Sequence, residues 1–295
     1  MTMLPLSPSP RRGRLSRYHR AIRRRLNKHL NFTTTATVNG QKVVFPQIYG
    51  ACGSLGEPWM ITLLQRLLGL DDGIFVDVGA NLGQTLAKAK TVAPERAYVG
   101  FEPNSFCAFY INEVIRRNGF TDCTVAPVGL ATRSELLKLT LPSANPGSPG
   151  GSIVPDFRTA RKGGTEALVP VFAFADICAA LCPTRIGVVK IDVEGAELDV
   201  LRGMMPRLGR DRPVLLLEIL PVYEAANAAR LERQEALEAV LAAENYCLLR
   251  VRKDADGAFA GVVAVERIGI HADLDACDYV IVPSERRAEI EAVLE

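Results

Sequence analysis

Two short runs, far apart in the chain, place acidic side chains where an apolar strand should give way to a helix. Residues 75–83 have the sequence Phe-Val-Asp-Val-Gly-Ala-Asn-Leu-Gly, and residues 190–197 have the sequence Lys-Ile-Asp-Val-Glu-Gly-Ala-Glu. Ligands of an open parallel α/β sheet bind at the carboxyl ends of its strands. An unpaired carboxylate is costly to bury in a core. The two runs therefore predict a catalytic pocket at one edge of a sheet.

The first run has the features of a ligand-binding turn. Gly79 and Gly83 would let a ligand approach the backbone, and amides at a helix N-terminus attract a carboxylate or phosphate. Nicotinamide enzymes carry G-x-G-x-x-G. Here the spacing is Gly-x-x-x-Gly, with Asp77 two residues before the first glycine. This favours a nucleoside with an amino-acid tail over a dinucleotide; the alternative is a tight strand–helix turn that binds nothing.

Glu102 follows the next predicted strand, in Phe101-Glu102-Pro103-Asn104. A carboxylate at that place can accept hydrogen bonds from both hydroxyls of a ribose. The alternative is an exposed strand-end glutamate or a charge that offsets a helix dipole. Because the Asp77 run lies just upstream, we favour ribose binding.

In the second run, Lys190, Asp192 and Glu194 occupy alternate positions. On an extended strand they would share one face. We interpret them as a base and positioning cluster beside the cofactor. The alternative is an ion pair of Lys190 with either carboxylate at a sheet edge.

These runs need a scaffold, and the alternation of apolar segments predicts one. Strands are predicted at residues 74–78, 97–101, 124–127, 186–191 and 214–218, and helices at 82–91, 104–118, 196–204 and 225–243. Such alternation predicts an α/β fold with a doubly wound parallel sheet. Later strands at 245–251 and 278–282, with a hairpin near 258–265, suit a Rossmann-like, seven-stranded, mostly parallel sheet whose last strand is antiparallel and whose helices cover both faces.

Two regions depart from this alternation. Before it, residues 37–45 predict a hairpin on an Asn-Gly turn, and residues 58–70 predict a helix. Within it, residues 142–155 are crowded with Pro, Gly and Ser. A long irregular stretch inside a compact domain is usually a functional loop or a linker.

Charge and composition bound the domain organisation. The chain has 295 residues, 48% of them hydrophobic, which is enough for a full core. We expect a basic tail over residues 1–30 with a cationic amphipathic helix, an N-terminal hairpin and helix over 31–70, and a catalytic domain over 71–295. Residues 11–30 could contact an anionic membrane surface or remain a solvated or packed helix. No apolar run approaches the ~20 residues that span a bilayer, and seven scattered cysteines suit reduced thiols. We therefore expect a cytoplasmic protein, at most peripheral at the membrane.

From about Asp71 to Glu218, the ordered motifs resemble the FkbM-type S-adenosylmethionine-dependent methyltransferases. The motifs are residues 76–83, Phe101-Glu102-Pro103, residues 150–153, residues 190–197, Leu201-Arg202-Gly203 and residues 213–218. The resemblance implies the seven-stranded methyltransferase fold and methyl transfer to a hydroxyl oxygen, often on a sugar, glycan or secondary metabolite. It also implies S-adenosylmethionine as cofactor and S-adenosylhomocysteine as product.

By the same resemblance, Asp77, Gly79, Asn81 and Gly83 would hold the methionine part of the cofactor, and Glu102 the ribose. Related methyltransferases often bind adenine with an acid after the third strand. Residues 126–130 are Ala-Pro-Val-Gly-Leu and contain no acid. The adenine contact is therefore not assigned.

Methyl transfer to a neutral hydroxyl needs alignment and a proton acceptor. The three histidines are His19, His29 and His271, and the first two lie in the basic tail. We therefore expect Asp192, Glu194 or Lys190 to be the base, and the lysine would need a pKa lowered by burial. Asp192, Glu194 and Glu218 are ligands of the kind Mg²⁺ takes, but their spacing is not diagnostic, so no metal site is assigned.

Two other functions remain open at this point. One is an RNA ribose 2′-O-methyltransferase that uses the tail for phosphate contacts, although the acidic body makes nucleic acid a less suitable partner. The other is a non-catalytic membrane-peripheral or scaffold protein that keeps the fold. The oligomeric state is not indicated by the sequence.

Overall fold

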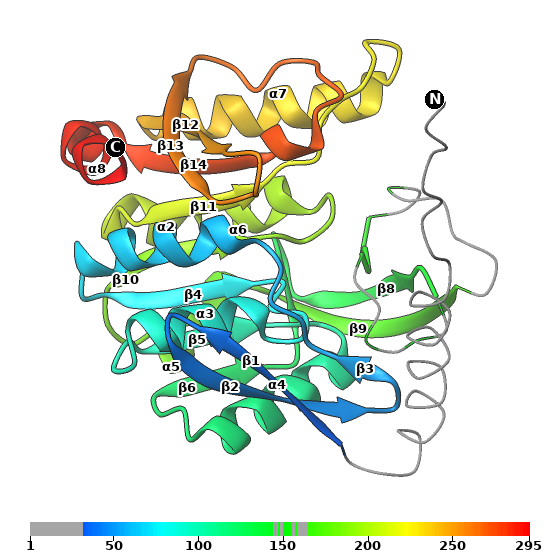
Figure 1. Cartoon of the computed structure of the whole chain (residues 1–295). Helices are drawn as coiled ribbons and strands as arrows, with labels where there is room; N and C mark the ends of the chain where they lie inside the picture. The colour runs from blue at the N-terminus through cyan, green and yellow to red at the C-terminus, as the bar shows by residue number, and fades with distance from the viewer. Residues whose placement is uncertain (1–31, 144, 146, 148–149, 155–156, 158–163) are drawn as a thin grey trace, which may run out of the picture.

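A mixed eight-stranded sheet forms the centre of the computed structural model (Figure 1). The structure describes residues 32–295 except 144, 146, 148–149, 155–156 and 158–163. The strand order is β13-β12-β14-β11-β10-β4-β5-β6. The predicted basic tail, with its membrane contact at residues 11–30, lies outside the described residues.

Five neighbouring strands of this sheet are parallel, as the alternation predicts. They are β4 (Ile74–Val78), β5 (Tyr98–Phe101), β6 (Cys123–Ala126), β10 (Ile186–Ile191) and β11 (Val214–Glu218). The predicted α/β class with a mostly parallel sheet is therefore confirmed.

The predicted count of seven strands is wrong by one. The late strands are β12 (Tyr246–Lys253), β13 (Phe259–Val265) and β14 (Asp278–Pro283), and β14 lies antiparallel between β11 and β12. The extra strand is β13, which pairs with β12 and forms the edge. Gly257, with φ of 74°, lies in the turn that sends the chain back. The predicted hairpin thus extends the sheet instead of standing beside it.

Helices cover both faces because adjacent strand residues enter different cores. Val76 and Val189 belong to the core on one face, while Phe75 and Val188 belong to the core on the other. The first core takes residues of α5 (Phe174–Leu181), α6 (Glu197–Asp211) and α7 (Ala228–Ala243), and the second takes residues of α2 (Pro58–Gly69), α3 (Gln84–Val92), α4 (Ser105–Asn118) and α8 (Arg287–Leu294). Two short 3₁₀ turns, η1 (Leu274–Ala276) and η2 (Ser284–Arg286), flank β14.

Helix α6 runs farther than its predicted end at residue 204. Pro206 lies inside it, and a proline removes one helical hydrogen bond. The helix continues because Leu208 is buried in the core and Arg207 pairs with Asp211 at 2.6 Å. Tertiary contacts therefore outweigh the local cost of the proline.

Two smaller sheets complete the fold. The first consists of β1 (Thr33–Val38), β2 (Gln41–Ile48) and β3 (Ala51–Cys52), and its predicted Asn39-Gly40 turn is confirmed, with φ of 47° and 74°. The second consists of β7 (Gly129–Ala131), β9 (Thr165–Ala173) and β8 (Glu135–Leu141), in that order. The strands of the second sheet flank residues 142–155, where the predicted alternation breaks, and the sequence analysis missed this sheet.

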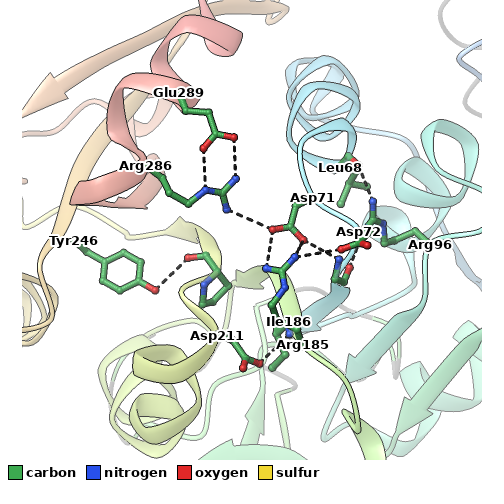
Figure 2. Close-up of polar contacts among 12 residues, drawn as sticks. Leu68, Asp71, Asp72, Arg96, Arg185, Ile186, Asp211, Tyr246, Arg286 and Glu289 are labelled. Atoms are coloured by element: carbon green, nitrogen blue, oxygen red, sulfur yellow. Dashed lines mark hydrogen bonds and ion pairs between the residues drawn. The ribbon is translucent and has the colours of Figure 1, made fainter.

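An ion cluster ties the chain together at the amino ends of the parallel strands (Figure 2). The Asp71 side chain is 5% exposed and accepts hydrogen bonds from Arg185 at 2.5 and 2.9 Å and from the Gly73 amide at 2.7 Å. Arg286, next to α8, lies 3.4 Å from the same carboxylate. The cluster thus joins the starts of β4 and β10 to the C-terminal helix.

No helix among the described residues is long and apolar enough to span a membrane.

Candidate active site

The two acidic runs meet because their strands are neighbours. β4 and β10 pair in parallel, with Lys190 opposite Asp77. The loop after β4 therefore begins beside the loop after β10. The Asp192 amide donates to the carbonyl of Val78 at 3.0 Å. The carboxyl ends of two central strands are thus joined before either loop reaches a ligand.

Gly79 is required by this junction. Its φ is +83°, and a Cβ built on it would lie 1.9 Å from the Asp192 carbonyl oxygen. A side chain at Gly79 would push the two loops apart. The motif predicted that Gly79 lets a ligand approach the backbone. The packing of the two runs is a second reason why a glycine is needed at this position.

A cavity of about 300 Å³ opens at this edge of the sheet. It is lined by six of the predicted site residues: Gly79, Asn81, Glu102, Lys190, Asp192 and Glu194. Asp77 and Gly83 are not among its lining residues. Asp77 is fully buried, 3.9 Å from the cavity-lining Lys190, and Gly83 precedes α3 in a left-handed conformation, facing Ile111.

Other parts of the chain also reach the cavity, and sequence reasoning missed most of them. Glu57 comes from the segment before α2, Leu139 and Leu141 come from β8, and Gly129 begins β7. None belongs to a motif with a chemical signature. The Pro-, Gly- and Ser-rich stretch contributes Gly150, Gly151 and Ile153, so its described part includes pocket-lining residues.

Glu102 is held ready to accept further hydrogen bonds. Its Oε2 accepts from the Asn81 amide and its Oε1 accepts from the Asn104 amide, both at 2.8 Å. A carboxylate oxygen has two lone-pair sites, so each oxygen can accept once more. Burial raises the pKa of Glu102 to about 7, against the opposing effect of the two amides.

Lys190 lies between a buried and an accessible carboxylate. Its Nζ is 3.0 Å from Asp192 Oδ2 and 3.9 Å from Asp77 Oδ1, and the Tyr98 hydroxyl donates to Asp77 Oδ2 at 2.7 Å. Burial acts to lower the pKa of Lys190, but Asp192, Asp77 and Glu57 outweigh it and raise that pKa above its ordinary value. The lowered pKa that a lysine base would need is not found. The geometry instead places the Lys190 amino group between two carboxylates, those of Asp192 and Asp77.

Asp192 is the carboxylate of this cluster that faces the cavity. Its side chain is 30% exposed and is paired with the ammonium of Lys190. Glu218 lies at the end of β11 in the same cavity wall. Burial, and then the charges of Asp192 and Asp278, raise the pKa of Glu218 well above its ordinary range. The cavity wall thus combines the carboxylate of Asp192, which is paired with a lysine, with the carboxyl group of Glu218, whose pKa is raised.

The remaining acid of the second run has a structural role at the start of α6. Glu197 Oε1 accepts a hydrogen bond from the Gly195 amide at 2.9 Å, and burial raises the pKa of Glu197 to about 7. Across the residues that the structure describes, no group of three or more His, Cys, Asp or Glu side chains is placed to hold a metal ion.

The family of the chain is shown by its sequence. Residues 77–246 match the model of the methyltransferase FkbM domain. The chain therefore belongs to the FkbM methyltransferase family. No curated protein matches it.

Several solved structures are similar to the chain. The FkbM methyltransferase from Methylobacillus flagellatus KT is 17% identical with a TM-score of 0.44; the similarity covers 72% of this chain and 43% of that one. The O-methyltransferase from Bacillus cereus, in complex with SAH, is 10% identical with a TM-score of 0.45, covering 77% and 80%. TYW2 from M. jannaschii, in complex with AdoMet, is 12% identical with a TM-score of 0.39, covering 86% and 88%. This chain thus spans less than half the length of the M. flagellatus protein.

Proposed function

We propose that this protein is an S-adenosylmethionine-dependent methyltransferase that methylates a hydroxyl oxygen of a sugar, glycan or secondary metabolite. The observation that carries the proposal is Glu102. It is a buried carboxylate, fixed by two backbone amides, with a free acceptor site on each oxygen at the end of the strand next to the Gly79 turn. Such a group suits the paired hydroxyls of a ribose. Membership of a methyltransferase family supports the same conclusion.

The cavity has suitable residues for each part of the cofactor. Glu102 would bind the ribose, and the backbone of Gly79 and Asn81 would face the methionine part. The start of α3 lies beside this loop and would attract the carboxylate of the methionine part. Asp77 would act through Lys190 instead of touching the cofactor. The apolar wall, which includes Phe101, Leu130, Leu139 and Leu141, would suit the adenine ring.

The bound cofactor supplies an electrophilic methyl group, and the protein has to align an acceptor oxygen with it. The oxygen must lose its proton as the new bond forms. Asp192 is the proton acceptor that we propose, because its carboxylate faces the cavity, is 30% exposed and is held by the Lys190 ammonium at 3.0 Å. Glu194 lines the same part of the cavity and would help to hold the acceptor.

The charge of the cavity indicates the kind of acceptor. Among the described lining residues, five carry a carboxyl group and only Lys190 carries a positive charge; the five are Glu57, Glu102, Asp192, Glu194 and Glu218. Lys190 is already engaged by Asp192 and Asp77. A phosphate-bearing acceptor would meet net negative charge here. This favours a neutral polyol over an RNA ribose.

Calorimetric titration with S-adenosylhomocysteine tests the cofactor. We expect micromolar binding that Glu102→Ala weakens at least about tenfold. Glu232→Ala is the matched control, because Glu232 is exposed on α7, far along the chain from the motif residues. Absence of binding by folded wild-type protein would refute the proposal.

Transfer of a tritiated methyl group tests the acceptor. The probes are neutral oligosaccharides and their phosphorylated counterparts, each with and without EDTA. We expect label on the neutral probes; label that survives mild alkali is not a methyl ester, and on a probe whose only nucleophiles are hydroxyl groups it is a methyl ether. Preferential labelling of phosphorylated probes or of RNA would contradict the proposed acceptor class.

A further inference from the structure

The loop that carries Asp192 and Glu194 has an unusual backbone. Glu194 has a φ of 54° and Gly195 has a φ of 103°. The left-handed region is uncommon for a residue with a side chain, and such conformations persist when the surroundings determine them. The contacts that determine this one can be identified.

The first contact comes from Ser152, in the Gly-Gly-Ser-Ile motif. Its buried hydroxyl donates to the carbonyl oxygen of Glu194 at 2.7 Å. The Ser152 hydroxyl oxygen accepts a hydrogen bond from the Val154 amide at 3.1 Å. The backbone of Ser152 is in turn paired with Thr140 of β8, by two hydrogen bonds of 2.9 and 3.1 Å. The hydroxyl is therefore fixed to the small sheet before it reaches the loop.

The second group of contacts comes from α7. Arg233 donates to the carbonyl oxygen of Gly195. Arg230 lies over the ring of Phe157, 4.4 Å from its centre, and donates to the Phe157 carbonyl at 2.7 Å. That ring packs directly on Gly195, where a Cβ would lie 2.3 Å from it. The loop is thus held on one side by Ser152 and on the other by Phe157 and Arg233.

None of these holding residues lines the cavity, whereas Asp192 and Glu194 do. We propose that Ser152 and Arg233 are positioning residues, which fix the backbone of residues 194–195 and so aim Asp192 and Glu194 at the acceptor. The catalytic consequence rests on the function proposed above, but the positioning itself does not. The expected effect is confined to the loop of residues 192–195. The proposed cofactor residues Asn81 and Glu102 are held by a hydrogen bond to each other, which does not involve Ser152 or Arg233.

Hydrogen–deuterium exchange of the full-length protein tests the positioning without a known acceptor. In Ser152→Ala and Arg233→Gln we expect the amides of residues 193–196 to exchange at least about tenfold faster. Peptides over residues 79–83 should not change. Ser152→Thr and Arg233→Lys keep a donor and should restore slow exchange. Arg252→Ala is the control, because Arg252 is exposed on β12 and its side chain donates to the Ala260 carbonyl, away from residues 193–196 in the sequence.

The binding and rate measurements separate positioning from general stability. The affinity for S-adenosylhomocysteine should stay within about threefold of wild type in both variants. With a neutral oligosaccharide that accepts label, kcat should fall at least about tenfold, while the KM for the cofactor hardly changes. Unchanged exchange at residues 193–196 in both variants would overturn the inference. So would faster exchange throughout the protein together with a lower thermal midpoint. A wild-type protein that does not bind S-adenosylhomocysteine would refute the proposed function, and the exchange result would still decide the positioning.

Discussion

Cofactor binding should depend on pH through Glu102. The pKa of this residue is raised to about 7 by burial. With that value, the ionised fraction falls from about 0.9 at pH 8 to about 0.1 at pH 6. If the ribose hydroxyls are bound by the carboxylate form, the association constant for S-adenosylhomocysteine falls by about tenfold, which is about 1.4 kcal/mol.

Calorimetry at pH 8, 7 and 6 measures this directly. Titration in buffers of different ionisation enthalpy counts protons, and at pH 6 we expect about one proton to be released on binding, because hydroxyl donors favour the charged carboxylate. Glu102→Gln should bind more weakly at pH 8 and show no such pH dependence.

The ligand-free protein should show the opposite linkage at Glu102. A carboxyl group whose pKa is raised on folding contributes stability at low pH, and this contribution is lost as the pH rises from about 4.5 to about 7. Glu102→Gln should remove this part of the pH dependence of unfolding. Equal pH dependence of cofactor binding in wild type and Glu102→Gln would refute the reasoning, because another group would then be responsible.

Two further predictions concern stability, measured by denaturant unfolding. Gly79→Ala should lower the free energy of unfolding by about 2–4 kcal/mol, because its Cβ would lie 1.9 Å from the Asp192 carbonyl. Gly40→Ala, with a similar φ of +74° and nothing within 4 Å, should cost only about 1 kcal/mol, and an equal loss in both would contradict the clash. Asp71→Ala should lower the free energy of unfolding by about 2–4 kcal/mol, less than for a fully buried ion pair because the arginine partners of Asp71 are partly exposed. Asp72→Ala should change the free energy of unfolding little, because the Asp72 carboxylate is fully exposed. The pKa of Asp71 is lowered on folding, so the Asp71→Ala difference should be full at neutral pH and shrink as the pH falls below about 4.

The central strands could be predicted because burial on both faces leaves a plain pattern. β10 and β11 begin and end at the predicted residues, since each is a short apolar run that ends at a charged or loop residue. The sheet of β8 and β9 left no such pattern. Its strands are separated by a long irregular stretch, and Leu136 and Leu168 are 66% and 74% exposed. Alternation of buried and exposed residues is the usual signal of a strand, and exposed apolar residues obscure it.

The candidate site was predictable where one strand end carries a whole motif. Gly79, Asn81 and Glu102 lie at the cavity for this reason, although their roles remain predictions. Glu57 could not be found, because it has no motif. Glu57 precedes α2, has a left-handed backbone conformation, and its side chain pairs with Lys88 at 2.8 Å. Only the tertiary fold shows that proximity.

Lys190 illustrates the same limit for electrostatics. Burial alone suggests a lowered pKa, and the sequence provides no means of adding the charges that come from other elements. In the structure, Asp192 from the same run, Asp77 from β4 and Glu57 from the N-terminal segment act together on its ammonium group. The raised pKa of Lys190 does not favour it as the base, and the geometry instead pairs it with neighbouring carboxylates.

The two predicted halves of the site are not independent of each other. The Gly79 turn rests on the carbonyl of Asp192, and Lys190 lies between Asp192 and the buried Asp77. A shift of the cofactor loop would therefore move the proposed base, whereas loss of the anchor at residues 194–195 would leave the hydrogen bond from the Asp192 amide to the Val78 carbonyl in place. Ser152 fixes the far end of the same loop. The alignment of methyl group and acceptor oxygen would thus depend on backbone contacts between the loops as much as on the side chains that touch the ligands.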